Sequence, residues 1–366
     1  MESLIHDAWR YPFLRCFTFR FMVRSGGGCS GVDRAEWRYR GRRLEKPMKT
    51  KFAMLAVWGM MFAASLPSQG ADPLIGVLAK RGDAKAEQRW APLADYLTQR
   101  IPGHSFRIIT LRFDEIAGSL KMSQVDFLLV NSGIYVENEA AFHLKCIATL
   151  RNKCGEQSTT QFGGVLFTRA DREDIRTIAD LKGRTFAAVD ETSLGGWIMA
   201  WREMKRAGFD PRHDLASLRF LGTHDAVVRA VLTRQVDGGA VRSDTLERMA
   251  VEGAIRLSDL RLLETPSAAD ERNKPEHFPY RCNTAYYPEW PFIKMPHVSD
   301  ALAKDVAAAL LAMPADSPTA IACQSAGWIA PLDYKPVHDA YRELELGPYR
   351  KPEPDAEPDS GLDRSP

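Results

Sequence analysis

The stretch VDETSLGGWIMAWREMK, residues 189–205, passes from the end of an apolar strand into an amphipathic helix. Thr192 and Ser193 stand where an N-cap residue is expected, because their side-chain oxygens can accept hydrogen bonds from the first free amides of a helix. Gly195 and Gly196 follow in the first turn, although glycine costs about 0.5–1 kcal/mol relative to alanine inside a helix. The glycine pair therefore indicates that another group approaches the backbone closely at this helix start.

An anion is the natural candidate for that group, because free N–H groups and the positive end of the helix dipole meet at a helix start. A plain N-cap would produce the same pattern of residues. The choice between a cap and an anion site therefore depends on the rest of the chain.

Short apolar runs alternate with helical runs on both sides of this stretch. The expected strands are residues 74–79, 106–111, 125–130 and 145–150, then 163–169, 184–190, 217–222 and 237–243, and finally 281–288. Strands that alternate with helices in this way indicate βαβ units and a mostly parallel sheet. We expect an α/β protein in which residues 72–164 and 266–349 form lobe 1 and residues 165–265 form lobe 2. A cleft between two such lobes is a usual place for a ligand.

The segment MKTKFAMLAVWGMMFAASLPSQGAD begins at Met48 with two lysines nearby, runs apolar over residues 52–66 and reaches small residues near Ala71. This order is typical of a secretory signal peptide. We therefore expect residues 48–71 to be removed and the mature protein to begin near Ala71 or Asp72, in the periplasm. We interpret residues 1–47 as a mis-annotated N-terminal extension, and a long atypical signal is the alternative.

The charge balance changes once these residues are set aside. The full chain carries 49 Lys and Arg against 47 Asp and Glu, for a net charge of +2, and the excess of basic residues lies in residues 1–71. The remaining chain is net acidic, which argues against a nucleic-acid partner. Residues 350–366 are acidic and rich in proline, so we expect a disordered tail.

Four cysteines follow the signal segment, namely Cys146, Cys154, Cys282 and Cys323. An exported protein meets an oxidising compartment, where disulfides are the default expectation. We expect at least one disulfide and prefer the pairs 146–154 and 282–323, with free, buried cysteines as the alternative. The Cys and His spacings do not match a zinc site, so no metal is expected.

Common catalytic and cofactor motifs are missing from the sequence. It contains no G-x-S-x-G elbow, no HExxH, no P-loop and no GxGxxG that follows a strand. We therefore expect a binding protein without a cofactor and not an enzyme.

Two stretches, TIADLKGRTFAAVDETSLGGWIMAWREMKRAGFD (177–210) and LGTHDAVVRAVLTRQVDGGAVRSDTLERM (221–249), resemble lobe 2 of type II periplasmic solute-binding proteins of the phosphate/phosphite/phosphonate class. Residues 76–115, 131–137, 286–313 and 327–349 are similar to a narrower branch, the periplasmic sensing domains of tetrathionate-type two-component kinases. The resemblance covers residues 74–349. It implies the type II two-lobe fold with a ligand cleft between the lobes.

The resemblance also implies a set of ligand-binding residues. The family's Ser/Thr motif at a helix N-terminus matches Thr192 and Ser193, although Leu194 and Gly195 depart from the Ser-Thr-Ser-Gly of phosphonate binders. The family's ligand-facing histidine matches His224, its acidic residue matches Asp244, and its lobe 1 aromatic matches Tyr135, with Asn131 and Ser132 on the same strand tip. Arg242 stands close to Asp244 and favours a wholly anionic ligand over an aminophosphonate.

Several of these residues have a structural alternative. His224 could cap the helix that follows it, and Arg242 could pair with Asp244 or Glu247. Lys80 and Arg81 follow the first strand and could add positive charge, but we favour solvated loop residues there. The stretch YPEWPF, residues 287–292, is interpreted as a rigid packed turn and not as part of the binding site.

The resemblance implies a periplasmic protein that captures a small oxyanion, phosphonate-, phosphite-, phosphate- or tetrathionate-like, by closing its two lobes. We expect Gly195 and Gly196 to be ligand-binding residues that let the oxyanion approach uncapped backbone amides of residues 192–197, with Ser/Thr hydroxyls and His and Arg donors beside them. We expect it to deliver the anion to an ABC permease in the inner membrane. The alternative is a ligand-sensing subunit that docks on a separate two-component histidine kinase. The residues alone do not distinguish among these anions.

Overall fold

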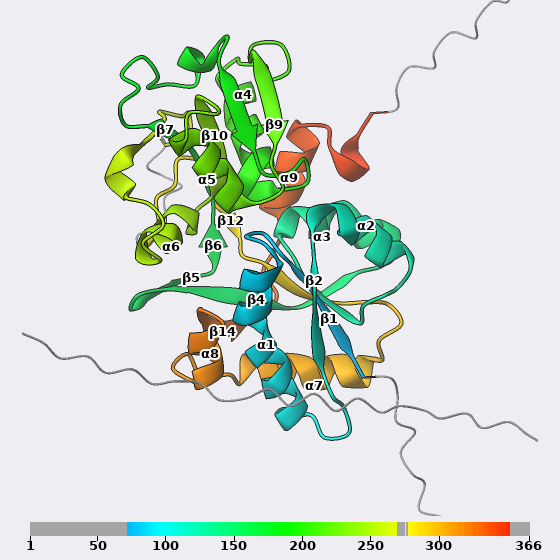
Figure 1. The fold of residues 1–366 in the computed structure, drawn as a ribbon. Coiled ribbons are helices and arrows are strands. Elements are labelled where there is room, and N and C mark those ends of the chain that lie inside the picture. The colour runs from blue at the N-terminus through cyan, green and yellow to red at the C-terminus, as the bar shows by residue number, and fades with distance from the viewer. Residues whose placement is uncertain (1–71, 269–274, 276, 352–366) are drawn as a thin grey trace, which may run out of the picture. The chain divides into compact units, whose positions relative to one another are not determined.

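The computed structural model describes residues 72–268, 275 and 277–351, all of which belong to one compact unit of the chain (Figure 1). The expected signal peptide, the extension before it and the part of the expected tail after residue 351 lie outside the described residues.

The first sheet has seven strands in the order β14-β4-β13-β3-β1-β2, with β5 paired to β4. The strands β1 (Leu74–Leu78), β2 (Arg107–Leu111) and β3 (Phe127–Leu129) are parallel to one another. The strand β13 (Pro291–Lys294) runs antiparallel between β3 and β4 (Lys145–Cys154), and β14 (Ser325–Ile329) and β5 (Gln157–Thr159) pair antiparallel with β4. The C-terminal part of the chain therefore completes a sheet that the N-terminal strands begin.

Six helices accompany this sheet in the described residues: α1 (Asp83–Arg100), α2 (Phe113–Lys121), α3 (Ser132–Phe142), α7 (Asp300–Leu311), α8 (Pro318–Ala322) and α9 (Lys335–Glu343). The strand β1 reads LIGVL and is almost wholly buried, as expected for a parallel strand covered on both faces. Helix α1 packs through Trp90, Leu93 and Leu97, which recur at helical spacing. It contacts α7 and α8, whereas α3 contacts α9. We call this sheet and its helices lobe 1.

The second sheet has five strands in the order β11-β7-β10-β8-β9. They are β7 (Gly164–Arg169), β8 (Thr185–Ala188), β9 (Ser217–Phe220), β10 (Gly238–Arg242) and β11 (Leu260–Leu262). Its helices are the π-helix η2 (Leu194–Ile198), which continues into α4 (Met199–Arg206), together with α5 (His224–Leu232) and α6 (Thr245–Val251). We call this sheet and its helices lobe 2. A two-stranded sheet pairs β6 (Gln161–Phe162) with β12 (Tyr287–Pro288). Single 3-10 turns lie at Ala179–Leu181, Leu257–Asp259 and Gly347–Tyr349.

The sheets are more mixed than the strand order in the sequence indicates. In lobe 2, β8 is parallel to β9 and β10, but β7 is antiparallel to β10 and β11. The strand expected over 281–288 is formed only at Tyr287–Pro288, because Asn283 instead bonds the backbone of Leu166 and Leu263. The strand of lobe 1 in this region is β13, which begins at Pro291, inside the stretch interpreted as a turn, and continues two residues beyond it to Lys294. Within the described residues no helix is both long and apolar enough to cross a bilayer.

The expected disulfides are wrong for this structure, in which all four cysteines of the described residues are free. Cys146 and Cys154 lie on the same strand, β4, eight residues apart. At about 3.3 Å per residue their Cα atoms are about 26 Å apart, far beyond the roughly 7 Å that a disulfide can span. Cys282 lies against the carbonyl of Thr284, and the buried Cys323 ends α8. Each thiol therefore has separate surroundings.

Thiol titration of denatured, unreduced protein that comprises residues 72–366 is expected to count four reactive groups per chain. The physical reason is the separation of the four cysteines, none of which is within bonding distance of another in the structure. A sample denatured in the presence of a reductant and then freed of it supplies the reference value. A count of two or fewer in the unreduced sample would contradict the structure.

Candidate functional site

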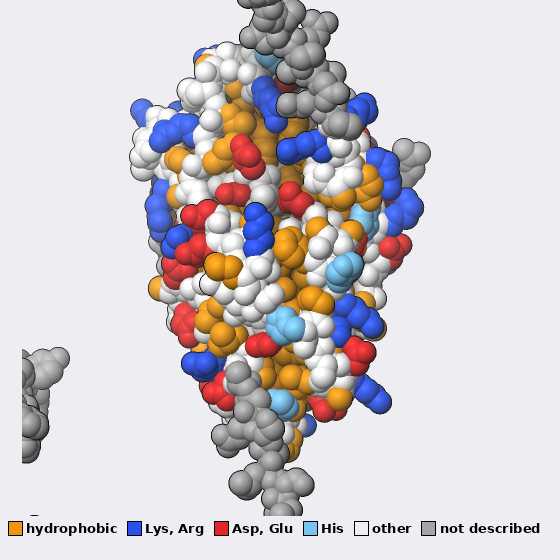
Figure 2. All heavy atoms as spheres, turned by 90° about the vertical axis from the view of Figure 1, so that its right-hand side faces the viewer, with side chains coloured by type: hydrophobic (Ala, Val, Ile, Leu, Met, Phe, Trp, Pro, Cys, Tyr) orange, Lys and Arg blue, Asp and Glu red, His pale blue; other side chains and the backbone are white. Residues whose placement is uncertain are grey.

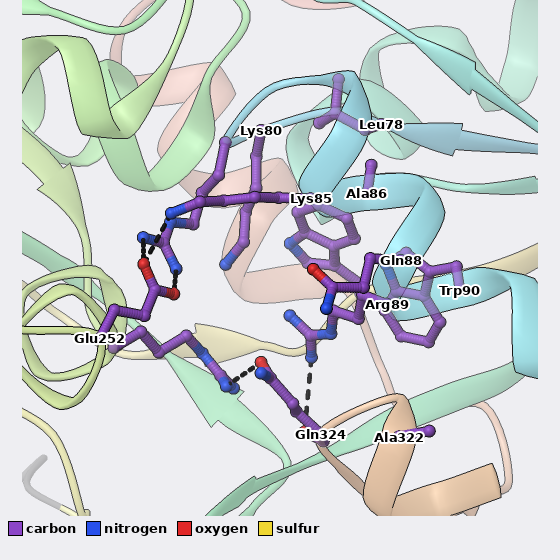
Figure 3. Close-up of a pocket in the computed structure, with 13 residues that line it drawn as sticks. Leu78, Lys80, Lys85, Ala86, Gln88, Arg89, Trp90, Glu252, Ala322 and Gln324 are labelled. Carbon is purple, nitrogen blue, oxygen red and sulfur yellow. Dashed lines mark hydrogen bonds and ion pairs between the residues drawn. The ribbon is translucent and has the colours of Figure 1, made fainter. Parts of the chain in front are cut away.

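The basic pocket lies between lobe 1 and lobe 2 and has a volume of about 560 Å³. The turn after β1 and the first half of α1 form one wall, α6 forms the opposite wall, and Trp290 and Gln324 contribute further sides (Figure 3). Figure 3 shows Lys80, Lys85 and Arg89 reaching from the β1–α1 segment toward Glu252 and Gln324. The volume falls within the range of small-molecule sites.

The local sequence after β1 explains why basic side chains gather here. The carboxyl ends of strands in open α/β sheets face ligand crevices, and Lys80 and Arg81 come two and three residues after the end of β1. Gly82, with a φ of +97°, makes the left-handed turn into α1. Lys85 and Arg89 are four residues apart on α1 and therefore share one face of the helix.

Side chains of both charges lie interspersed on the face of the molecule in Figure 2. The pocket differs from that face, because five cationic side chains line it against the single carboxylate of Glu252. These five are Lys80, Arg81, Lys85, Arg89 and Arg248.

Asp244 is fully buried at the start of α6 and lies at the centre of a group of charged residues. We call Asp244 together with Lys80, Arg89, Arg242 and Arg248 the inner cluster. The Asp244 carboxylate accepts from Lys80 Nζ at 3.1 and 3.2 Å and from Arg248 Nε at 2.9 Å. Arg242 Nη1 lies 3.8 Å away. Burial alone would raise the pKa of Asp244, but Arg242, Lys80 and Arg248 hold that pKa well below its ordinary value. Asp244 therefore anchors three cations from two lobes.

The backbone of Asp244 is also unusual, with a φ of +83° and a ψ of −25°. Left-handed backbone costs of order 1–3 kcal/mol in a residue other than glycine, and it persists where surrounding contacts hold it. Here the three cations supply those contacts.

Arg242 and Trp290 leave two buried donors without a hydrogen-bond partner, namely Arg242 Nε and Trp290 Nε1. The Arg242 guanidinium pairs with the buried Glu289 and lies 4.4 Å from the ring of Phe162 and 5.8 Å from that of Trp290. Buried N–H groups normally have partners, so these two donors are exceptions, and of the two residues only Trp290 lines the basic pocket.

Burial and the crowding of like charges lower the pKa values of two basic groups of the inner cluster. Burial and the Arg242 guanidinium lower the pKa of Lys80 well below its ordinary value. Burial and Arg248 lower the pKa of Arg89 to about 9. Asn152 joins the two lobes here, since its Oδ1 accepts from Arg89 at 3.2 Å and from Arg248 at 3.0 Å. An added anion would relieve the mutual repulsion of these cations.

The residues of the expected helix-start site do not line the basic pocket. Ser193 is the N-cap of η2, and its Oγ accepts from the amide of Gly196 at 3.2 Å, so that amide is capped. A Cβ on Gly195 would lie 3.0 Å from the Arg242 Cβ, and one on Gly196 would lie 2.4 Å from Val189. The groups that approach the two glycines closely are therefore other residues of lobe 2, namely Arg242 of β10 and Val189 after β8.

The expected ligand-facing histidine, His224, does not line the basic pocket. His224 is buried, its backbone N–H donates to the Lys80 carbonyl at 3.1 Å, and its Nδ1 accepts from the Arg242 backbone N–H at 3.1 Å. Burial and Lys80 lower the pKa of His224 well below its ordinary value, so the ring is neutral with the proton on Nε2. His224 thus forms hydrogen bonds with the backbone of two members of the inner cluster, Lys80 and Arg242.

The lobe 1 residues expected at the site lie away from the basic pocket, and the side chain of one of them, Asn131, bonds to lobe 2. Asn131 caps α3, and its Nδ2 donates to the Thr192 carbonyl across the lobes at 3.4 Å. Ser132 Oγ donates to the Pro288 carbonyl at 3.0 Å, and the Tyr135 ring packs edge-on to Tyr334 at 5.2 Å. Neither Asn131, Ser132, Tyr135 nor Thr192 lines the basic pocket.

Sequence reasoning missed Lys85, Arg89, Arg248 and Trp290, and it assigned Lys80 and Arg81 to a solvated loop. Lys80 and Arg81 are in fact largely buried in ion pairs. The available signal was the basic spacing of residues 81, 85 and 89 directly after a buried strand. No group of His, Cys, Asp and Glu in the described residues is arranged to hold a metal ion.

Residues 75–339 match the model of a protein family described as the periplasmic substrate-binding protein of ABC transporters for phosphonate. The chain belongs to this family. The match spans both lobes, so the family assignment covers the whole basic pocket. It gives the chain a solute-binding role, and it confirms the family resemblance predicted from the sequence.

This chain is also similar to a sensor protein. The chain is 32% identical over 279 residues to the tetrathionate sensor histidine kinase TtrS of Salmonella typhimurium. The alignment covers 76% of this chain and 44% of the kinase, so the chain spans less than half the length of that relative. This match agrees with the predicted resemblance to the tetrathionate-sensor branch.

Solved structures confirm the predicted type II two-lobe α/β fold. PhnD1 of Prochlorococcus marinus, in complex with methylphosphonate, superposes with a TM-score of 0.60 at 15% identity, covering 75% of this chain and 98% of that one. A binding-protein component of an ABC phosphonate transporter from Pseudomonas aeruginosa gives a TM-score of 0.60 at 14% identity, covering 75% and 87%. At these identities the likeness establishes the fold alone.

Proposed function

We propose that this protein captures a small oxyanion in the basic pocket between its lobes. The observation that carries the proposal is the charge of the pocket and its inner wall. Six cations (Lys80, Arg81, Lys85, Arg89, Arg242 and Arg248) face four carboxylates (Asp225, Asp244, Glu252 and Glu289). Buried charge is costly unless it is paired, so the excess of about two positive charges calls for an anionic ligand.

The ligand carries no ammonium group in this proposal. Asp244 is the carboxylate that an amine would need, but its two oxygens already bind Lys80 and Arg248. An ammonium group entering the pocket would add a further positive charge to the cluster. A phosphorus or sulfur oxyanion without an amine fits the cationic donors that line the pocket.

We further propose that the protein delivers this anion to an ABC permease, the role that the family description implies. The likeness to a tetrathionate sensor kinase favours a second candidate, a sensing subunit that docks on a separate histidine kinase. The two candidates share the same oxyanion-binding step and the same periplasmic setting, and they differ in the membrane partner.

A thermal-shift screen of the purified mature protein tests the binding step. Phosphate, phosphite, methylphosphonate, sulfate, thiosulfate and tetrathionate are compared with glycine, arginine and glucose. A binding oxyanion at about 100 times its dissociation constant should stabilise the fold by roughly 2.7 kcal/mol through mass action. For a chain of this size we expect a rise of several degrees in melting temperature.

The same screen separates the two possible locations of the anion. Ser193→Ala and His224→Ala test the residues expected from the sequence, which remain predicted contributors, and Arg89→Met tests the basic pocket. Lys182→Met, at a side chain with 78% exposure, is the control. If no oxyanion shifts the transition of the wild-type protein, the proposed function is wrong.

A further inference from the structure

Four charged side chains join lobe 1 to lobe 2 at the edge of the basic pocket. Arg81 Nε lies 2.5 Å from Asp225 Oδ1, and Arg81 Nη1 lies 2.7 Å from Glu252 Oε1. Lys85 Nζ lies 2.9 Å from Asp225 Oδ2 and 2.6 Å from Glu252 Oε2. Each of the two cations of lobe 1 thus contacts both carboxylates of lobe 2. We call Arg81, Lys85, Asp225 and Glu252 the interlobe cluster.

Three elements position the interlobe cluster. Arg81 lies in the turn before α1 and Lys85 in the first turn of α1, whereas Asp225 is in the first turn of α5 and Glu252 is the C-cap residue of α6. No bond within the cluster joins residues of the same lobe. Separation of the lobes would therefore break all of its ion pairs together.

Burial makes part of this cluster stronger than an ordinary surface ion pair. The Arg81 and Asp225 side chains are 8% and 4% exposed, whereas Lys85 and Glu252 are 39% and 37% exposed. Burial opposes ionisation of Asp225, yet the hydrogen bonds from Arg81 and Lys85 keep its pKa below the ordinary value. Exposed pairs such as Lys85–Glu252 contribute little, so the contacts of the buried Arg81 guanidinium with Asp225 and with Glu252 carry most of the attraction.

We propose that the interlobe cluster is a latch that holds the lobes together and sets the time for which a bound anion is retained. This inference rests on the proposed function for its effect on the ligand, but not for its effect on the lobes. Three of the four residues (Arg81, Lys85 and Glu252) also line the basic pocket, whereas Asp225 does not. An anion in the pocket would leave only after these pairs had separated.

The latch makes a prediction opposite to that of simple electrostatics. Neutralising Asp225 or Glu252 makes the surroundings of the pocket more positive, which by charge alone would tighten the binding of an anion. If the two carboxylates hold the lobes together, neutralising either one should instead speed release. The sign of the change in affinity therefore distinguishes the two explanations.

The experiment compares Glu252→Gln and Asp225→Asn with the wild-type protein and with Asp259→Asn. Asp259 is a matched control, because its side chain is also 37% exposed and it pairs with Arg256 inside lobe 2. Dissociation of the oxyanion that gives the largest shift among the six screened is followed by tryptophan fluorescence in stopped flow. We expect Glu252→Gln to raise the dissociation rate about tenfold, which corresponds to 1.4 kcal/mol.

A second measurement does not depend on any ligand. Small-angle scattering of the protein without added oxyanion should give a larger radius of gyration for Glu252→Gln than for the wild type and Asp259→Asn. If the proposed function fails but the latch is real, this difference still appears. A Glu252→Gln protein with an unchanged radius of gyration, or one that binds the anion more tightly, overturns the latch. Glu252→Gln is the decisive variant, because Asp225 is buried and its replacement also affects folding.

Discussion

Replacing Asp244 by asparagine is expected to lower the free energy of unfolding by about 3–5 kcal/mol. The substitution removes the buried charge that Lys80, Arg242 and Arg248 share and leaves three cations facing one another. Asparagine keeps the size of the side chain and tolerates the left-handed backbone of this position, so the loss reports the charge. Urea unfolding measured by circular dichroism gives the value.

The control for this prediction is Asp259→Asn, which removes a carboxylate from an exposed ion pair. Exposed pairs contribute about 0–1 kcal/mol, so this variant should unfold close to the wild type. Sulfate or phosphate added to Asp244→Asn should recover part of the lost stability, because an anion can replace the missing negative charge. An Asp244→Asn protein as stable as the control would show that the inner cluster does not hold the lobes together.

Replacing Lys80 by methionine is expected to weaken binding of the oxyanion found in the screen by about 10–100-fold. Lys80 lines the pocket and points its ammonium group into the inner cluster. Hydrogen bonds to charged groups contribute about 1.5–3 kcal/mol, and each 1.4 kcal/mol is a factor of ten in the dissociation constant. Isothermal titration calorimetry at constant ionic strength gives the two constants.

Lys182→Met is the matched control, because it removes a lysine of lobe 2 that is mostly exposed and far from the pocket lining. Its dissociation constant should stay within about twofold of the wild type. Equal weakening in Lys80→Met and Lys182→Met would mean that only the overall charge of the protein matters. An unchanged constant in Lys80→Met would place the anion elsewhere.

Much of the fold followed from local sequence pattern. The apolar runs at residues 74–79 and 237–243 contain the strands β1 and β10 in the structure, and the helices α1 and α6 follow them. The strand order in space did not follow, because antiparallel β13 inserts between β3 and β4 from a part of the chain far away in sequence. The prolines and aromatics of 287–292 conceal that strand from pattern reasoning.

The candidate site was less predictable than the fold. The sequence favoured uncapped amides at the start of η2, whereas Ser193 caps the Gly196 amide and Gly195 lies against Arg242. Cysteine count alone led to the wrong disulfides, because it carries no information on which residues share one strand. The position of Lys80 after a strand does not indicate whether its side chain is solvated or pairs with Asp244, which is 164 residues away in the sequence.

The sequence by itself determined the fold class and the family. These properties depend on periodicity and on the order of motifs, both of which are local or additive along the chain. Only the tertiary structure decided which basic residues form the pocket. Lys80 and Arg89 belong to lobe 1, and Arg242 and Arg248 belong to lobe 2. Their charges act on one another only because packing brings them to a few ångströms in a buried setting, where Coulomb interactions are strong.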